Sequence, residues 1–172
     1  SAAGLTVGSA ITGNLYLTGV NPVNVAGTVT LIAQRNGADI YFYQNANTFN
    51  KLHAQADNGI RVYSDLTTSV DEMYLDGDME NDSAGDNQLG SLKIDGGVTV
   101  RTNTGMTIQS PSGQIDAMGA ITLEAKQGIT LNSDIRAQGA DRHLNFKPDA
   151  DGSGDGIFRV LAGKKVENLL AN

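Results

Sequence analysis

Hydrophobic and polar positions alternate most regularly between residues 97 and 131. Four short units each place a threonine between two apolar residues and are introduced by a glycine: Gly97-Val-Thr-Val, Gly105-Met-Thr-Ile, Gly119-Ala-Ile-Thr-Leu and Gly128-Ile-Thr-Leu. Alternation with a period of two is typical of a strand with one buried face. Glycines between such units fit tight corners. The pattern therefore predicts short strands separated by turns.

The units recur at a constant distance along the chain. The difference in sequence number is 121−98 = 23 between Val98 and Ile121, and 129−106 = 23 between Met106 and Ile129. The same step from Ile121 reaches Leu144, which opens another alternating unit, Leu-Asn-Phe. A fixed period between similar strand units indicates coils that stack on one another. We therefore expect an all-β chain, a parallel β-helix (β-solenoid) with three short strands in each coil.

The remaining segments fit one all-β domain, residues 1–172, with three parts. Residues 1–70 contain short strands with glycine corners but irregular spacing, which predicts an irregular, capping or assembly part. Residues 71–90 are read as an acidic loop, and residues 91–172 as the regular coil. No window shows sustained helical periodicity. The alternative is a β-sandwich or jelly roll whose N-terminal strand, about residues 1–17, completes the sheet of a neighbour.

Composition and charge narrow the function. The 172 residues include no cysteine, which excludes disulfides and thiolate sites, and no apolar run long enough to span a membrane as a helix. The net charge of −7 lies within residues 71–90, which hold seven acids and no lysine or arginine. Such a segment disfavours nucleic acid and anionic lipid as partners. Cations are the expected partners.

Two acidic segments are candidate calcium sites. Asp149, Asp151, Ser153 and Asp155 alternate along a glycine-containing turn, as the oxygen ligands of calcium loops do. The twelfth position of this loop is Val160 instead of a carboxylate, so the loop is not an EF-hand.

The second candidate lies in the acidic segment. Asp76, Asp78, Glu80 and Asp82 occupy alternate positions, and carboxylates so close together repel one another unless a cation screens them. We expect Asp76, Asp78 and Asp82 to be ligands. For both segments the alternative is a solvated polar loop without an ion.

The chain offers little for catalysis. His53 and His143 are far apart in sequence and are expected to be surface or ladder residues. No pair of carboxylates is set apart by its surroundings as an acid and a base. We therefore expect no enzyme. The run Tyr41-Phe42-Tyr43, with Tyr63 and Tyr74, is a candidate aromatic platform for sugars, although alternate members of such a run more often lie in the core.

The regular part also resembles a known family. Several segments show this resemblance. They are Ala84-Gly-Asp-Asn, the glycine-threonine units, Leu144-Asn-Phe, Asp149-Ala-Asp-Gly-Ser-Gly-Asp-Gly and Phe158-Arg-Val. These segments resemble repeats of large filamentous-haemagglutinin-like surface proteins of bacteria. The resemblance covers about residues 72–166, whereas residues 1–70 depart from it. It implies an exported, right-handed parallel β-helix that acts in an adhesin, fibre or matrix without catalysis.

These observations lead to two functional hypotheses. The first is a non-enzymatic, extracellular or cell-surface structural protein, stabilised by calcium, that self-associates end to end into a fibre, surface filament or adhesin, because open strand edges require a cover. The second is a secreted carbohydrate-binding or polysaccharide-cleaving β-helix, with a glycan or cell surface as partner. Neither hypothesis involves nucleic acid or membrane insertion.

Overall fold

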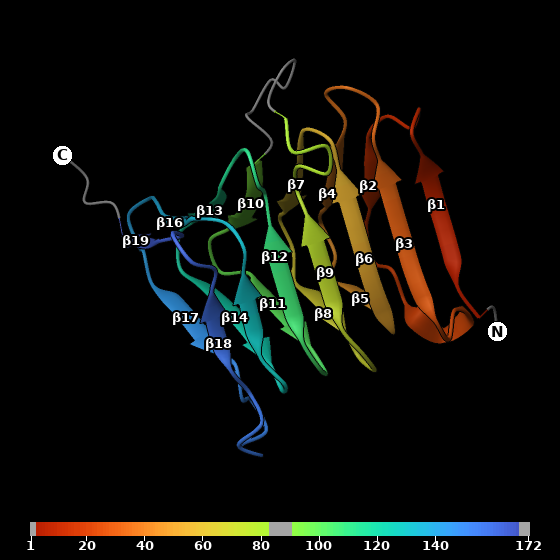
Figure 1. Cartoon of the computed structure of the whole chain (residues 1–172). Coiled ribbons are helices and arrows are strands. Elements are labelled where there is room, and N and C mark those ends of the chain that lie inside the picture. Colours follow the sequence, from red (N-terminus) through yellow and green to blue (C-terminus); the bar gives the residue numbers. More distant parts are fainter. Residues whose placement is uncertain (1–2, 83–90, 169–172) are drawn as a thin grey trace.

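The alternation of apolar and polar residues winds the chain into a three-sided β-solenoid of about six turns (Figure 1). The computed structural model describes residues 3–82 and 91–168. The strands of the first sheet, in spatial order, are β1 (Leu5–Ser9), β3 (Thr28–Ala33), β6 (Lys51–Ala56), β9 (Met73–Asp76), β12 (Met106–Gln109), β15 (Ile129–Leu131) and β18 (Phe158–Val160).

The other two sheets complete each coil. The second sheet contains, in spatial order, β19 (Val166–Asn168), β16 (Ile135–Ala137), β13 (Ile115–Met118), β10 (Ser91–Asp95), β7 (Gly59–Val62), β4 (Asp39–Phe42) and β2 (Leu15–Leu17). The third contains β17 (Leu144–Lys147), β14 (Ile121–Ala125), β11 (Thr99–Thr102), β8 (Leu66–Thr68) and β5 (Asn47–Phe49). The only helical element in the described residues is a 3-10 turn, Pro22–Asn24.

The register confirms the regular repeat that the sequence predicted. Met106 lies opposite Ile129, and Ile121 lies opposite Leu144. Val98 belongs to the same ladder, because its carbonyl oxygen accepts the backbone hydrogen bond of Thr122. Each strand pairing in the described residues is parallel. The sandwich alternative is therefore wrong, since the chain closes each coil with parallel neighbours and not with antiparallel hairpins.

The strands of residues 5–68 lie in the same three sheets as the regular repeats. Leu5 pairs with Val29, Val29 with Leu52, and Leu52 with Met73, so the steps in sequence number are 29−5 = 24, 52−29 = 23 and 73−52 = 21. The glycine-threonine unit occurs in the first two of these coils, as Gly4-Leu-Thr-Val and Gly27-Thr-Val-Thr-Leu, but is absent from the strands that contain Leu52 and Met73. Because the steps are also unequal, the sequence pattern does not display a regular period here.

Two later coils contain longer corners. Met73 pairs with Met106, a step of 106−73 = 33, and Ile129 pairs with Phe158, a step of 158−129 = 29. The first excess falls in the predicted acidic loop, of which residues 83–90 lie outside the described part. The second falls in the 149–156 loop.

The solenoid interior is a continuous apolar core. Inward-facing side chains stack coil on coil, and the largest fully buried ones include Phe42, Phe49, Leu31 and Ile60. The Phe42 and Phe49 rings meet edge to face, with centroids 6.2 Å apart. Burial of this apolar surface is the main stabilising contribution to the fold.

A buried polar cluster lies at the corner before β4 and β7. The Arg61 Nη2 atom is 3.1 Å from Asp39 Oδ1, and both side chains are almost completely buried. The Asn58 amide donates hydrogen bonds to both Asp39 carboxylate oxygens, at 3.1 and 3.2 Å. The Tyr41 hydroxyl donates to Asp39 Oδ2 at 3.0 Å, and Arg61 Nη1 donates to the carbonyl oxygen of Ser91. The cluster thereby joins three consecutive coils.

Candidate functional site

The two ends of the solenoid expose inward-facing apolar side chains. Leu5 and Phe158 occupy the same ladder as Ile129, which is fully buried, yet they are 45% and 37% exposed. Val7 at the first end and Val166 at the second are likewise 38% and 46% exposed. Strands β1 and β2 at one end, and β17, β18 and β19 at the other, have a neighbour on one side only within the described residues. Figure 1 shows these edges at opposite ends of the molecule.

The end surfaces differ in shape. The β1 end has an apolar hollow of about 240 Å³, lined among others by Leu5, Val7, Leu17 and Phe49. At the β18 end, Phe158 stacks on Phe146 with ring centroids 4.7 Å apart. The β1 end therefore offers a recess, and the β18 end offers an exposed aromatic ring.

Two of the predicted metal ligands, Asp76 and Asp78, lie together at the end of β9. Asp76 Oδ2 accepts hydrogen bonds from the Tyr74 hydroxyl and the Gln109 amide, both at 2.9 Å, and Asp76 Oδ1 accepts one from the backbone of Asp78 at 3.2 Å. Asp78 is completely buried, and its Oδ2 accepts a hydrogen bond from the backbone of Ser112. Its Oδ1 has no hydrogen-bond partner among the described residues.

The third predicted ligand of this set, Asp82, lies in the exposed segment that follows the turn after Asp78. Asp82 has an interaction partner in the structure. The hydrogen bonds given above for Asp76 and Asp78 come from Tyr74, Gln109 and Ser112, and from the backbone of Asp78 to Asp76.

The loop that contains Asp149, Asp151, Ser153 and Asp155 closes on its own hydrogen bonds. Asp149 accepts from the Ser153 hydroxyl at 3.1 Å and from the Gly154 backbone at 3.0 Å. Asp151 accepts from the Ser153 backbone, and the hydrogen bonds from Ser153 lower the pKa of the Asp151 carboxyl. The Asp155 backbone donates to the Ser153 hydroxyl oxygen at 3.4 Å. Ser153 is thus the centre of an exposed polar turn.

The described residues of the two acidic segments form no recognisable metal cage. In residues 3–82 and 91–168, no three histidine, aspartate or glutamate side chains are grouped in a way that could hold a metal ion. Calcium binding by either segment stays a prediction.

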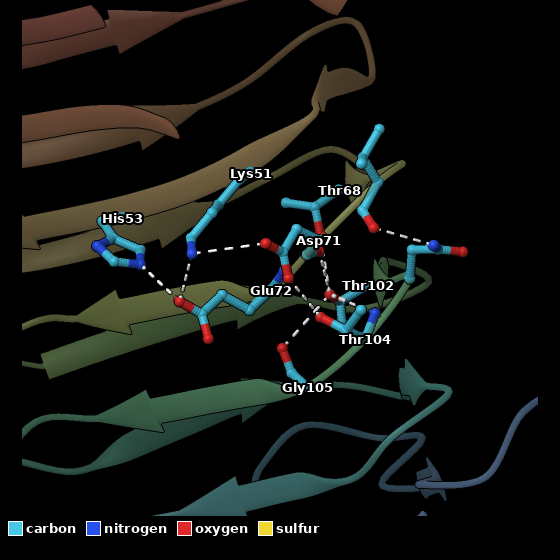
Figure 2. Close-up of polar contacts among 10 residues, drawn as sticks. Lys51, His53, Thr68, Asp71, Glu72, Thr102, Thr104 and Gly105 are labelled. Atoms are coloured by element: carbon cyan, nitrogen blue, oxygen red, sulfur yellow. Dashed lines mark hydrogen bonds and ion pairs between the residues drawn. The ribbon is translucent and has the colours of Figure 1, made fainter. Parts of the chain in front are cut away.

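A charged network crosses the corner between the third and first sheets (Figure 2). Glu72 Oε1 lies 2.8 Å from Lys51 Nζ and 3.2 Å from His53 Nε2. The hydrogen bond from Lys51, followed by that from His53, lowers the pKa of Glu72. Asp71 is 3.6 Å from Lys51 and accepts a hydrogen bond from the Thr104 hydroxyl at 3.1 Å. The network therefore ties together residues from three consecutive coils.

His53 lies on the outer face of the first sheet, as the sequence predicted. It is opposite Thr30 on one side and Tyr74 on the other, and its ring meets the Tyr74 ring at 5.7 Å. His143 is exposed, and its Nε2 lies 3.4 Å from Asp141. The contact of His53 with Glu72 could not be read from the sequence, because the step from His53 to Tyr74 is 74−53 = 21 and departs from the regular repeat.

The tyrosines divide between two faces. Tyr16 stacks on Tyr41 at 4.8 Å on the second sheet, with Tyr63 at 6.5 Å from Tyr41, while Phe42 is buried. Tyr74 lies on the first sheet instead. Sequence reasoning missed Tyr16, whose opposite partner in the register is Tyr41. Tyr16 is 59% exposed, so an aromatic surface does exist.

The comparisons with known proteins support a repeat protein. A family described as "Repeats of unknown function" (DUF5649) matches residues 76–135, a segment that runs from the end of β9 to the start of β16. Neither the curated proteins nor the solved structures include a significant match. In the described residues, no helix has the length and apolar character to cross a membrane.

Proposed function

We propose that the chain is a non-enzymatic structural segment that associates end to end with a second copy, as part of an extracellular fibre, surface filament or adhesin. The observation that supports this is the exposure of core-ladder side chains at both ends of the solenoid. Open parallel edges with apolar side chains are templates for further strands. A head-to-tail contact that does not close into a ring generates a filament.

The shapes of the two ends favour a head-to-tail contact over a symmetric one. The β18 end of one copy presents Phe158, and the β1 end of the next presents the hollow beside Leu5 and Val7. Stacking β18 against β1 would extend the first sheet, and the inward ladder would continue from Phe158 to Leu5. The interface would thus repeat the pairing already present between coils.

The extracellular location, the filamentous-haemagglutinin-like origin and the calcium ion belong to the same proposal. The resemblance of about residues 72–166 to bacterial surface repeats supports the location. The unpartnered Oδ1 of the buried Asp78, next to Asp76, supports a cation at the end of β9. Such an ion would neutralise two carboxylates that now lie side by side.

The test measures association at controlled protein concentration. We expect the purified chain to form longer particles as concentration rises, by sedimentation velocity, and fibres by electron microscopy. Val7→Lys and Phe158→Lys each place a charge at one end and should each give monomers. Met118→Lys, at a 42% exposed position on the side of the solenoid, is the matched control and should assemble normally.

Mixing the two end variants tests the direction of assembly. The Val7→Lys chain keeps an intact β18 end, and the Phe158→Lys chain keeps an intact β1 end, so an equal mixture should stop at dimers. A wild-type chain that stays monomeric at all concentrations, or fibres that tolerate both substitutions, would refute end-to-end association. Parallel samples with calcium and with a chelator show whether the ion contributes to assembly, because only the calcium proposal predicts a different extent of assembly in the two samples.

A further inference from the structure

A polar notch crosses the outer face of the first sheet between β6 and β18. Its volume is about 610 Å³, and its lining includes His53, Glu72, Tyr74, Thr107, Thr130 and Arg159. Strands in a sheet are about 4.8 Å apart, so five neighbouring strands extend over roughly 19 Å. The notch is therefore elongated along the solenoid axis.

The shape follows from two outward-facing ladders. In one ladder the long side chains of His53 and Tyr74 are followed by the short Thr107 and Thr130 and then by the long Arg159. The ladder two positions earlier shows the same order, because Glu72 is followed by Gly105 and Gly128 and then by Ile157. Two successive coils thus form a low floor, bounded by walls from the coils before and after them. Figure 2 shows His53, Glu72 and Gly105 on this face.

The floor and one wall have unused hydrogen-bonding capacity. Within the described part of the chain, the hydroxyl groups of Thr107 and Thr130 make no hydrogen bond, and the Arg159 guanidinium has neither a hydrogen bond nor an ion pair. Glu72, in contrast, is already paired with Lys51 and His53. The notch therefore offers hydroxyl groups in its centre and an unpaired cation at the end nearest β18.

We propose that this notch binds an oligosaccharide that contains a uronic acid, with sugar hydroxyls on Thr107 and Thr130 and the sugar carboxylate on Arg159. Threonine hydroxyls both donate and accept, which suits ligand hydroxyl groups. A guanidinium forms paired, charge-assisted hydrogen bonds with a carboxylate. The amide of Gln127 and the ring of Tyr74 add a polar group and an apolar surface beside the floor.

An extended peptide fits this face less well. Peptides that add to a sheet do so through unpaired backbone groups at an edge strand. Strands β9, β12 and β15, under the middle of the notch, have paired neighbours on both sides. Recognition here depends on side chains, and those side chains match a hydroxyl-rich ligand.

The structure offers a variant that fills the notch without disturbing the fold. A Cβ atom built at Gly105 meets no atom within 4 Å, and the residue does not have a positive φ. Gly105→Gln should therefore fold normally and block the floor. Thr30→Ala is the matched control for Thr107→Ala, because Thr30 occupies the same outward ladder but lies outside the notch.

The experiment screens the whole chain against a panel of uronic-acid oligosaccharides, and against the methyl esters of the same oligosaccharides. Calorimetry or NMR titration then measures affinity for the best member. Arg159→Gln removes the charge-assisted pair with the sugar carboxylate and should weaken binding at least about tenfold. The methyl ester, which lacks the carboxylate charge, should bind the wild type and Arg159→Gln equally weakly. Gly105→Gln should abolish binding, Thr107→Ala should weaken it, and Thr30→Ala should leave it unchanged.

Three results would overturn the proposal. They are no binding by any uronic-acid oligosaccharide of the panel, binding that survives Gly105→Gln, and preferential binding of acidic peptides over the sugars. The Val7→Lys chain, expected to be monomeric, should bind the oligosaccharide like the wild type. Failure of end-to-end assembly and failure of the notch are therefore separate outcomes.

Discussion

Replacing the corner glycine Gly128 by alanine should destabilise the solenoid, because this glycine has no room for a side chain. Its φ is +121°, and a Cβ atom would lie 2.8 Å from the carbonyl oxygen and 3.2 Å from the backbone nitrogen of Ile157. The obstacle is the backbone of the next coil, which cannot rotate away as a side chain could.

The expected magnitude combines two costs. A backbone conformation that other residues rarely adopt costs about 1–3 kcal/mol, and the shift of a packed neighbour costs about 1–3 kcal/mol. We therefore expect Gly128→Ala to lower the free energy of unfolding by about 2–6 kcal/mol. The control is Gly105→Ala, at the equivalent place one coil earlier, where a Cβ atom meets nothing within 4 Å. That change should be neutral or stabilise the fold by about 0.4–1 kcal/mol, through the unfolded chain.

Urea unfolding, followed by circular dichroism and by intrinsic tyrosine fluorescence, measures both variants. The two signals should give coincident transitions before a free energy is taken from them. Hydrogen exchange adds a local view, because Gly128→Ala should reduce protection in β18 and β19 before it affects β3 and β6. Equal stability of Gly128→Ala and Gly105→Ala, within about 0.5 kcal/mol, would refute the corner geometry.

Two further predictions concern the buried cluster on the second sheet. Asp39→Ala should lower the free energy of unfolding in urea by about 3–5 kcal/mol, because it leaves the buried Arg61 cation without its carboxylate. The control, Arg101→Met, removes an exposed ion pair with Glu124 and should lower it by less than about 1 kcal/mol. Equal losses would contradict the burial of the Asp39–Arg61 pair. Burial and the hydrogen bond to Asp39 raise the pKa of Tyr41 to about 12, so folding favours the neutral phenol. The resulting stabilisation is complete below about pH 10, which is the usual pKa of tyrosine. It is lost as the pH rises from 10 towards 12. Melting temperatures across that range should fall less steeply for Tyr41→Phe than for the wild type, and parallel curves would count against the shift.

The sequence predicted the later coils well, because there the corners and the strands share one motif. The step from Met106 to Ile129 and the step from Ile121 to Leu144 are both found in the register. In the earlier coils the same architecture is built only partly with this motif. Leu5 and Val29 lie in glycine-threonine units, but Leu52 does not, and the steps between these coils are unequal, so no regular period is visible.

The candidate sites were harder to predict than the coils. The hydrogen bonds of Asp76 to Tyr74 and Gln109 depend on register across coils, and acid spacing alone does not reveal them. The notch could not be predicted from the sequence for a related reason. It arises because Thr107 and Thr130 follow two long side chains in a ladder, and that order exists only after the coils are stacked.

The two long corners show how this architecture tolerates new sequence. The step of 33 between Met73 and Met106 and the step of 29 between Ile129 and Phe158 both exceed the regular repeat, yet the strands on both sides keep their alignment. The extra residues lie between strands, so the chain length varies at the corners and is fixed on the three faces. A designer who wished to graft an epitope or a reporter peptide onto this scaffold would choose those corners first.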